Sequence, residues 1–134
     1  MDPTQCSVIY IKNPAEHYQE CIGALRSVFK DVAVEPNNPN VFSVLHSRRA
    51  PTLVLFDIDD CNHTVHSNLE LLKTVVQQVR DGILRNIVPI VCSSSDSPEF
   101  MVQCLYNGAA DYLLKPLQED VVKTMFLHDV TDVL

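Results

Sequence analysis

Short, uninterrupted apolar runs recur along this chain and constrain its fold more than any other feature. Leu53–Phe56 and Val88–Cys92 contain no charged residue, and Val8–Ile11 is a short run of the same kind. A strand that is apolar throughout is buried on both faces, which is typical of a parallel sheet covered by helices. Val32–Val34 and Tyr112–Leu114 are weaker strand candidates.

Helical periodicity fills the segments between these runs. Tyr18, Ile22, Leu25 and Phe29 lie four, three and four residues apart, which places one apolar stripe on one helix face. The other expected helices are a short one over 40–46, one opened by a capping box at Ser67–Glu70, one from Ser97 to Gly108, and one from Gln118 onward. The order is strand then helix, repeated five times, so we expect an α/β fold with a doubly wound parallel sheet.

Three of the expected strands deliver a polar residue near their carboxyl ends. These residues are Asp57, Ser94 and Lys115, and the segment Lys12–Asn13 follows the first strand in the same way. In open parallel sheets the ligand site lies outside the carboxyl ends of the strands. A carboxylate, a hydroxyl and an ammonium are therefore expected at one edge of the sheet.

Size and charge exclude several classes of protein. With 134 residues the chain is expected to form one domain over 1–134. A net charge of -7 argues against a nucleic-acid surface. No apolar run approaches the roughly 18 residues of a membrane helix, and the N-terminus lacks the pattern of a signal peptide. Five cysteines without paired spacing favour reduced thiols and a cytoplasmic location.

Three segments together resemble the receiver domain of two-component response regulators, over essentially the whole chain. They are Pro51–Ile58, Val88–Ser95 and Gly108–Leu117. The resemblance implies a flavodoxin-like (βα)5 sheet with strand order 2-1-3-4-5.

The same resemblance assigns roles to individual residues. It implies that Asp57 accepts a phosphoryl group from a histidine kinase or phosphotransfer protein. It further implies that Ser94 and Tyr112 sense the phosphate, that Lys115 binds it, and that the bond before Pro116 is cis.

The chain departs from the family where the family holds Mg²⁺. Two adjacent acidic residues follow the first strand in receivers, whereas Lys12 and Asn13 stand here. Mg²⁺ prefers carboxylate and water ligands, so we expect no cofactor or only weak Mg²⁺ binding through Asp57 and Asp59. Lys12 or Lys115 could instead pair with Asp57 and supply the metal's positive charge.

Simpler interpretations stay open for each residue. Asp57 could cap the following turn, and Ser94 could belong to a serine run that caps the next helix, with a register uncertain by one residue. The cluster 61–66, beside Asp59, contains one cysteine and two histidines that could hold zinc, although a loop with two histidines is the simpler interpretation.

These observations favour a degenerate receiver that acts as a regulatory or interaction domain and is not an enzyme. We expect it to be the N-terminal module of a larger signalling protein, such as a cyclic-nucleotide phosphodiesterase or a kinase. The alternatives are an active phospho-accepting receiver that uses Asp57, and a flavodoxin-like enzyme or small-ligand binder. The third is disfavoured because no glycine-rich phosphate loop follows the first strand.

Protein partners or a fused effector domain are the expected binding partners. In receivers the fourth helix, fifth strand and fifth helix form the signalling surface, and here that surface would present Tyr106, Asp111 and Lys123. A mixed surface without a long apolar patch suits a weak homodimer.

Overall fold

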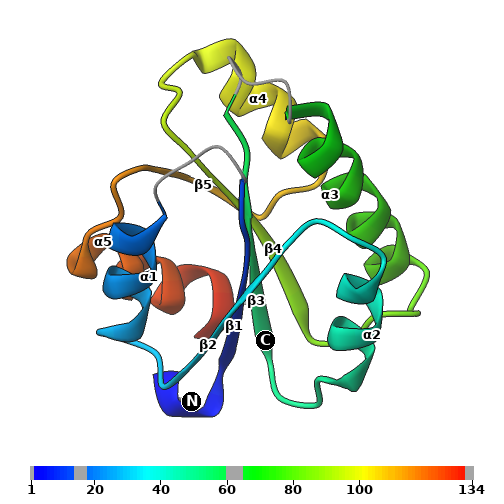
Figure 1. Cartoon of the computed structure of the whole chain (residues 1–134), viewed down its shortest axis with the longest axis horizontal. Helices are drawn as coiled ribbons and strands as arrows, with labels where there is room; N and C mark the ends of the chain where they lie inside the picture. The colour runs from blue at the N-terminus through cyan, green and yellow to red at the C-terminus, as the bar shows by residue number, and fades with distance from the viewer. Residues whose placement is uncertain (1, 14–17, 60–64, 132–134) are drawn as a thin grey trace.

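The structure, a computed structural model, describes residues 2–13, 18–59 and 65–131. Within these residues, five parallel strands form one sheet in the order β2-β1-β3-β4-β5, as Figure 1 shows. The strands are β1 (Ser7–Ile11), β2 (Asp31–Glu35), β3 (Thr52–Asp57), β4 (Ile87–Ser93) and β5 (Asp111–Leu114). The predicted fold class and strand order are therefore confirmed.

Helices cover both faces of the sheet (Figure 1). One face carries α1 (Gln19–Arg26) and α5 (Glu119–Met125), and the other carries α2 (Asn40–Ser47), α3 (Val65–Arg80) and α4 (Pro98–Tyr106). A short 3₁₀ turn, η1 (Pro3–Gln5), precedes β1, and a π-helix, η2 (Phe126–Thr131), continues α5. In the parts of the chain described, no helix has both the length and the apolar character that crossing a membrane requires.

The three central strands are buried along their whole length, as their apolar runs predict. Their side chains alternate between two cores. Tyr10 and Leu55 belong to the core under α1 and α5, whereas Ile11 and Phe56 belong to the core under α2, α3 and α4. Since Asp57 follows Leu55 at a spacing of two, it lies on the α1–α5 side of the sheet, as Tyr10 does.

Two predicted helix ends are confirmed by their backbone geometry. Ser97 caps α4, where its hydroxyl oxygen accepts from the Phe100 amide at 3.4 Å, and Pro98 follows at the first helical position. After α4 the chain turns at Gly108 with a φ of 106°. A Cβ at Gly108 would meet the side chain of Val76 at 2.4 Å, so the close approach of α3 also requires glycine there.

The capping box predicted at Ser67–Glu70 is wrong. Helix α3 begins at Val65, so Ser67 lies inside the helix and is not its N-cap. The Asn68 side chain instead donates to the main-chain carbonyl of Asp57 at 2.7 Å and accepts from the Asn37 amide group. The four-residue signature is local and can occur within a helix whose start is set by tertiary contacts.

The outer side of α4 is more apolar than the sequence analysis predicted. Val102, Leu105 and Tyr106 are all exposed, Tyr106 to 86%, and Leu114 of β5 is exposed as well. The three α4 residues share one helix face by their spacing of three and four. They face solvent because the opposite side of α4 buries Phe100 and Cys104 in the core.

Candidate functional site

Asp57 ends the central strand β3 and is completely buried, with 0% of its surface exposed. Both of its carboxylate oxygens accept hydrogen bonds. Lys115 Nζ donates to Oδ1 at 2.7 Å, and the Tyr10 hydroxyl donates to Oδ2 at 2.5 Å. Each carboxylate oxygen therefore accepts from one side chain, Oδ2 from β1 and Oδ1 from the loop after β5.

Asp59 brings a second carboxylate to the same place. Its Oδ2 accepts from Lys115 Nζ at 3.0 Å, and its Oδ1 accepts from the Ser93 hydroxyl at 3.0 Å and from the Ser94 amide at 2.7 Å. The Lys115 side chain, 7% exposed, thus bridges two buried acids. One ammonium between two carboxylates leaves the cluster with a formal charge of −1.

The end of β5 places Lys115 opposite the end of β4. Ser93 pairs with Leu114 in the ladder, and the Lys115 amide donates to the Ser93 carbonyl at 2.8 Å. The Lys115–Pro116 peptide bond is cis, which is the geometry that the sequence resemblance implies. From this position the lysine side chain reaches across β4 toward the end of β3.

Burial and hydrogen bonding shift the pKa values of this cluster in opposite directions. Burial raises the pKa of Asp57, and the hydrogen bonds from Lys115 and Tyr10 oppose that shift. For Asp59 burial also acts upward, but the Ser94 amide and Lys115 outweigh it and lower the pKa. For Lys115 burial acts downward, and the bonds to Asp57 and Asp59 outweigh it and raise the pKa. We take the cluster as ionised at neutral pH, because each carboxylate faces donors on both oxygens.

Tyr10 is a site residue that the sequence analysis missed. It lies in β1 with 0% of its surface exposed, and burial raises the pKa of its phenol, so the hydroxyl remains a donor. The Cys92 thiol lies 3.6 Å from the same hydroxyl and donates to it. The available signal was the one tyrosine within the apolar run Val8–Ile11, since a buried tyrosine usually finds a hydrogen-bond partner.

The two predicted sensing residues lie close by, but neither side chain forms one of the hydrogen bonds to the carboxylates. The Ser94 side chain is exposed, and only its amide binds Asp59, whereas the neighbouring Ser93 supplies the hydroxyl. The Tyr112 hydroxyl donates to the Ser95 carbonyl at 2.7 Å, and its ring packs edge-on against Phe100. Tyr112 therefore ties β5 to the loop before α4.

Lys12 does not lie on Asp57. Its Nζ lies 5.9 Å from the centre of the Tyr18 ring, and among the described residues Lys12 forms no ion pair. Asn13 is buried next to it. Of the two lysines considered as partners of Asp57, the structure brings only Lys115 to the carboxylate, because β5 directs it there.

Comparison with curated proteins gives several related sequences, although no protein-family profile matches the chain. Two-component response regulator-like APRR3 of Arabidopsis thaliana is 28% identical over 122 residues, which is 90% of this chain and 23% of that protein. Two-component response regulator-like APRR5 of the same plant is 28% identical over 105 residues, or 78% of this chain and 18% of that protein. The chain thus spans less than a quarter of the length of these relatives.

Comparison with solved structures identifies the fold. The N-terminal signal receiver domain of a response regulator from Bacteroides fragilis superposes with a TM-score of 0.71 at 19% identity, covering 95% of this chain and 98% of that one. A response regulator from Thermotoga maritima gives a TM-score of 0.69 at 18% identity, covering 96% and 98%. This chain has the fold of a receiver domain and is similar in sequence to response regulator-like proteins.

As its described side chains are arranged, the Asp57 cluster does not fit a divalent cation. A response regulator from Burkholderia pseudomallei with the same fold, at a TM-score of 0.61 and 17% identity over 96% of this chain and 70% of that one, was solved with a phosphorylated aspartic acid and a calcium ion. Here the Lys115 ammonium lies within 3.0 Å of both carboxylates that could bind such an ion. Lys12 and Asn13 add no carboxylate.

The structure does not test the prediction that the cluster 61–66 could hold zinc. The cluster 61–66 and Asp60 lie outside the residues and side chains that the structure describes. Among those that it does describe, no group of three histidine, cysteine or acidic residues could hold a metal ion.

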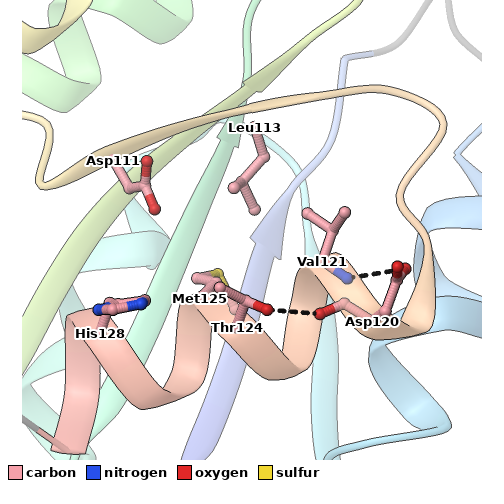
Figure 2. A pocket seen from close by; sticks show the side chains of 7 residues that line it. All are labelled: Asp111, Leu113, Asp120, Val121, Thr124, Met125 and His128. Atoms are coloured by element: carbon pink, nitrogen blue, oxygen red, sulfur yellow. Dashed lines mark hydrogen bonds between the residues drawn. The ribbon is translucent and has the colours of Figure 1, made fainter.

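A pocket of about 210 Å³ lies between β5 and α5. It is lined by Asp111, Leu113, Asp120, Val121, Thr124, Met125 and His128, as Figure 2 shows. Asp120 bonds within its own helix, where its carboxylate accepts from the Val121 amide and its carbonyl from the Thr124 hydroxyl. None of the candidate site residues contributes to this pocket.

Proposed function

We propose that this receiver-like domain is a regulatory interaction module whose Asp57 site is closed to Mg²⁺-dependent phosphorylation. The observation that carries the proposal is the Lys115 ammonium, which binds Asp57 at 2.7 Å and Asp59 at 3.0 Å. An ion pair of this kind supplies positive charge to the carboxylates without a metal. The domain then acts through its surface rather than through a phosphorylation cycle.

The chemistry of phosphoryl transfer explains why this arrangement is unfavourable. The transferring group carries negative charge that a metal ion normally neutralises, and the attacking oxygen must approach in line. Both oxygens of Asp57 are already acceptors of short hydrogen bonds inside the protein. Attack would require breaking one of these bonds in a fully buried carboxylate, without a strong metal site to compensate.

We further propose that the domain is one module of a longer signalling protein. The curated relatives support this, because the chain spans 23% and 18% of their lengths. Their names specify a response regulator-like protein and neither a phosphodiesterase nor a kinase, so fusion to such an enzyme stays a prediction. The partner would be a fused effector domain or a docking protein, with a histidine kinase or phosphotransfer protein as the upstream candidate.

The proposed module has no catalytic role of its own and a cytoplasmic location. Cys6, Cys21 and Cys92 are buried and form no disulfide within the described parts of the chain, which suits a reducing compartment. The exposed apolar side chains of α4 and β5 support weak self-association through this face.

An active receiver that uses Asp57 is the second candidate. The observation in its favour is that Asp57, Asp59, Ser93 and Lys115 meet at one point, so a rotation of the lysine side chain would expose two carboxylates. Two carboxylates are the ligands that Mg²⁺ prefers.

Phosphorylation by acetyl phosphate distinguishes the closed interaction module from the active receiver. The protein is incubated with acetyl phosphate and Mg²⁺, and its intact mass is measured beside that of Asp57→Asn. We expect the wild-type protein to remain predominantly unmodified. A stoichiometric gain of one phosphoryl group that Asp57→Asn abolishes would establish the active receiver instead.

A further inference from the structure

Tyr10 makes a contact with Asp57 that differs in kind from the lysine contact. Its hydroxyl donates to Oδ2 at 2.5 Å, while Lys115 uses Oδ1. Cys92 donates to the same phenol oxygen, so the thiol and the phenol form a buried chain of hydrogen bonds that ends at the accepting carboxylate. Tyr10, Asp57 and Cys92 all have 0% of their surface exposed.

The two donors differ in how easily they can leave the carboxylate. Lys115 is carried by the loop that follows the edge strand β5, and its ammonium sits on a flexible four-carbon stem. Tyr10 belongs to β1, which is paired on both sides by β2 and β3, and its ring is part of the packed core under α1 and α5. A side chain enclosed at this density cannot swing away without opening the core.

We propose that Tyr10 is the positioning residue that keeps Asp57 closed. Its hydroxyl occupies Oδ2 permanently, whereas Lys115 forms the movable half of the closure on Oδ1. A cation or phosphoryl group that displaces Lys115 would still meet a carboxylate with one oxygen taken. This inference rests on the proposed function, since it explains how the closed state of the same site is held.

The alignment of β1 with β3 makes this contact possible. Tyr10 pairs with Leu55 in the ladder, two residues before Asp57, and both side chains lie on the same face of the sheet. The length of a phenol spans this offset of two residues, whereas a phenylalanine at the same place would fill the core and leave Oδ2 without its donor. The Tyr10 hydroxyl can therefore be removed by substitution while the aromatic ring continues to fill the core.

The test is a Mg²⁺ titration of four proteins, followed through the Ser94 amide by NMR. The Ser94 amide donates to Asp59 and therefore reports on the cluster directly. The proteins are the wild type, Tyr10→Phe, Tyr18→Phe and Asp57→Asn. Tyr18→Phe is the matched control, because it removes the same atom from a ring whose centre lies 6.3 Å from that of Tyr10.

We expect Tyr10→Phe to bind Mg²⁺ about tenfold more tightly than the wild type, the ratio that corresponds to one hydrogen bond to a charged group. Tyr18→Phe should match the wild type, and Asp57→Asn should abolish any gain. Equal affinities for Tyr10→Phe and the wild type would overturn the role of Tyr10, as would an equal gain in Tyr18→Phe. Tight binding by the wild type would contradict the proposed function, and the ratio between the two proteins would still judge Tyr10.

A measurement on the wild-type protein covers the case in which Tyr10→Phe does not fold. The Tyr10 hydroxyl proton should appear as a slowly exchanging, downfield NMR resonance because it is buried in a short bond to a carboxylate. Asp57→Asn should shift this resonance upfield, since a neutral acceptor binds the proton less strongly. The same resonance position in both proteins would overturn the contact on which the inference depends.

Discussion

A single ammonium group, that of Lys115, bridges two buried carboxylates at and just after the end of β3. Removing it would leave Asp57 and Asp59 side by side without a counter-charge. Like charges at this separation repel strongly when water is excluded, and an unpaired buried charge is costly. Lys115 is therefore a structural residue in the closed state, whatever role it has in signalling.

Lys115→Ala should lower the free energy of unfolding by about 3–5 kcal/mol, the range for breaking a buried ion pair from one side. Lys12→Ala should cost less than about 1 kcal/mol, because it removes only a cation–π contact with Tyr18. Urea unfolding of both variants at neutral pH measures the difference. Equal, near-zero shifts of the two midpoints would reject a structural ion pair.

At the scale of single residues, the sequence predicted some contacts of Asp57 and missed others. The sequence predicted Lys115 at Asp57, because strand ends in a parallel sheet meet at one edge. It did not predict that the same ammonium also reaches Asp59, since that contact depends on the directions of the side chains in space. Tyr10 was missed because its contact depends on the register between β1 and β3, which periodicity alone does not set.

At the scale of elements, α3 packs closely against the turn after α4 because residue 108 of that turn is a glycine and has no side chain. Gly108 has a positive φ, and a Cβ there would meet Val76. By contrast, a Cβ at Gly23 in α1 would meet nothing within 4 Å. The two glycines therefore have opposite structural roles.

Gly108→Ala should destabilise the protein by about 1–3 kcal/mol, as overpacking does, with backbone strain in addition. Gly23→Ala should stabilise it by about 0.5–1 kcal/mol, because alanine is favoured within a helix. Thermal unfolding of both variants checks the opposite signs. If both changes shift the midpoint in the same direction, the described packing of α3 on this turn is contradicted.

A second element-scale feature joins η2 to β5. Asp129 of η2 is 9% exposed, and one of its carboxylate oxygens has no hydrogen-bond partner among the residues that the structure describes. Burial and a hydrogen bond with Asp111 raise the pKa of Asp129 to about 8. The folded protein thus retains a proton that the unfolded chain releases near pH 4.

Because the folded-state pKa is the higher one, this group should make the protein less stable as the pH rises from about 4 to about 8. Asp129→Asn removes the titration, so its urea midpoint should fall less than that of the wild type between about pH 5 and about pH 9. Asp120→Asn, on the exposed part of α5, is the control and should follow the wild type. Parallel curves for all three proteins would exclude a buried proton at Asp129.

The elements themselves were largely predictable, with boundaries that depended on tertiary contacts. Runs such as Leu53–Phe56 and Val88–Cys92 identify central strands because both faces of these strands are buried. The start of α3 at Val65 was not predictable from the capping pattern at Ser67. The apolar outer side of α4 was missed because the sequence does not show which of its residues face the core.

For the whole molecule, we expect the Asp57 site, closed as proposed, to act independently of the α4–β5 face, which consists of the exposed apolar side chains of Val102, Leu105, Tyr106 and Leu114. If the site does not change state, the face should keep one conformation and bind its partner constitutively. Val102 and Tyr106 of α4 are its most exposed apolar side chains. Coupling between this face and Asp57 is then the property that distinguishes an active receiver from this one.

Tyr106→Glu should weaken self-association, because it places a charge in the proposed interface, whereas Asp57→Ala should leave it unchanged. Ile83→Glu is the matched control, since Ile83 is also an exposed apolar residue but follows the end of α3, outside the face. Sedimentation velocity across a range of concentrations measures all three variants. A dimer that dissociates in Asp57→Ala and tolerates Tyr106→Glu would show that the acceptor site still controls the surface.

Beryllofluoride tests the closed state of Asp57 most directly, because it imitates a phosphoryl group on a carboxylate in the presence of Mg²⁺. ¹⁹F NMR of the wild-type protein with beryllofluoride and Mg²⁺ separates bound from free fluoride species. The closed site predicts only the signals of free species. A set of bound signals that reaches stoichiometric intensity and disappears in Asp57→Asn would contradict it.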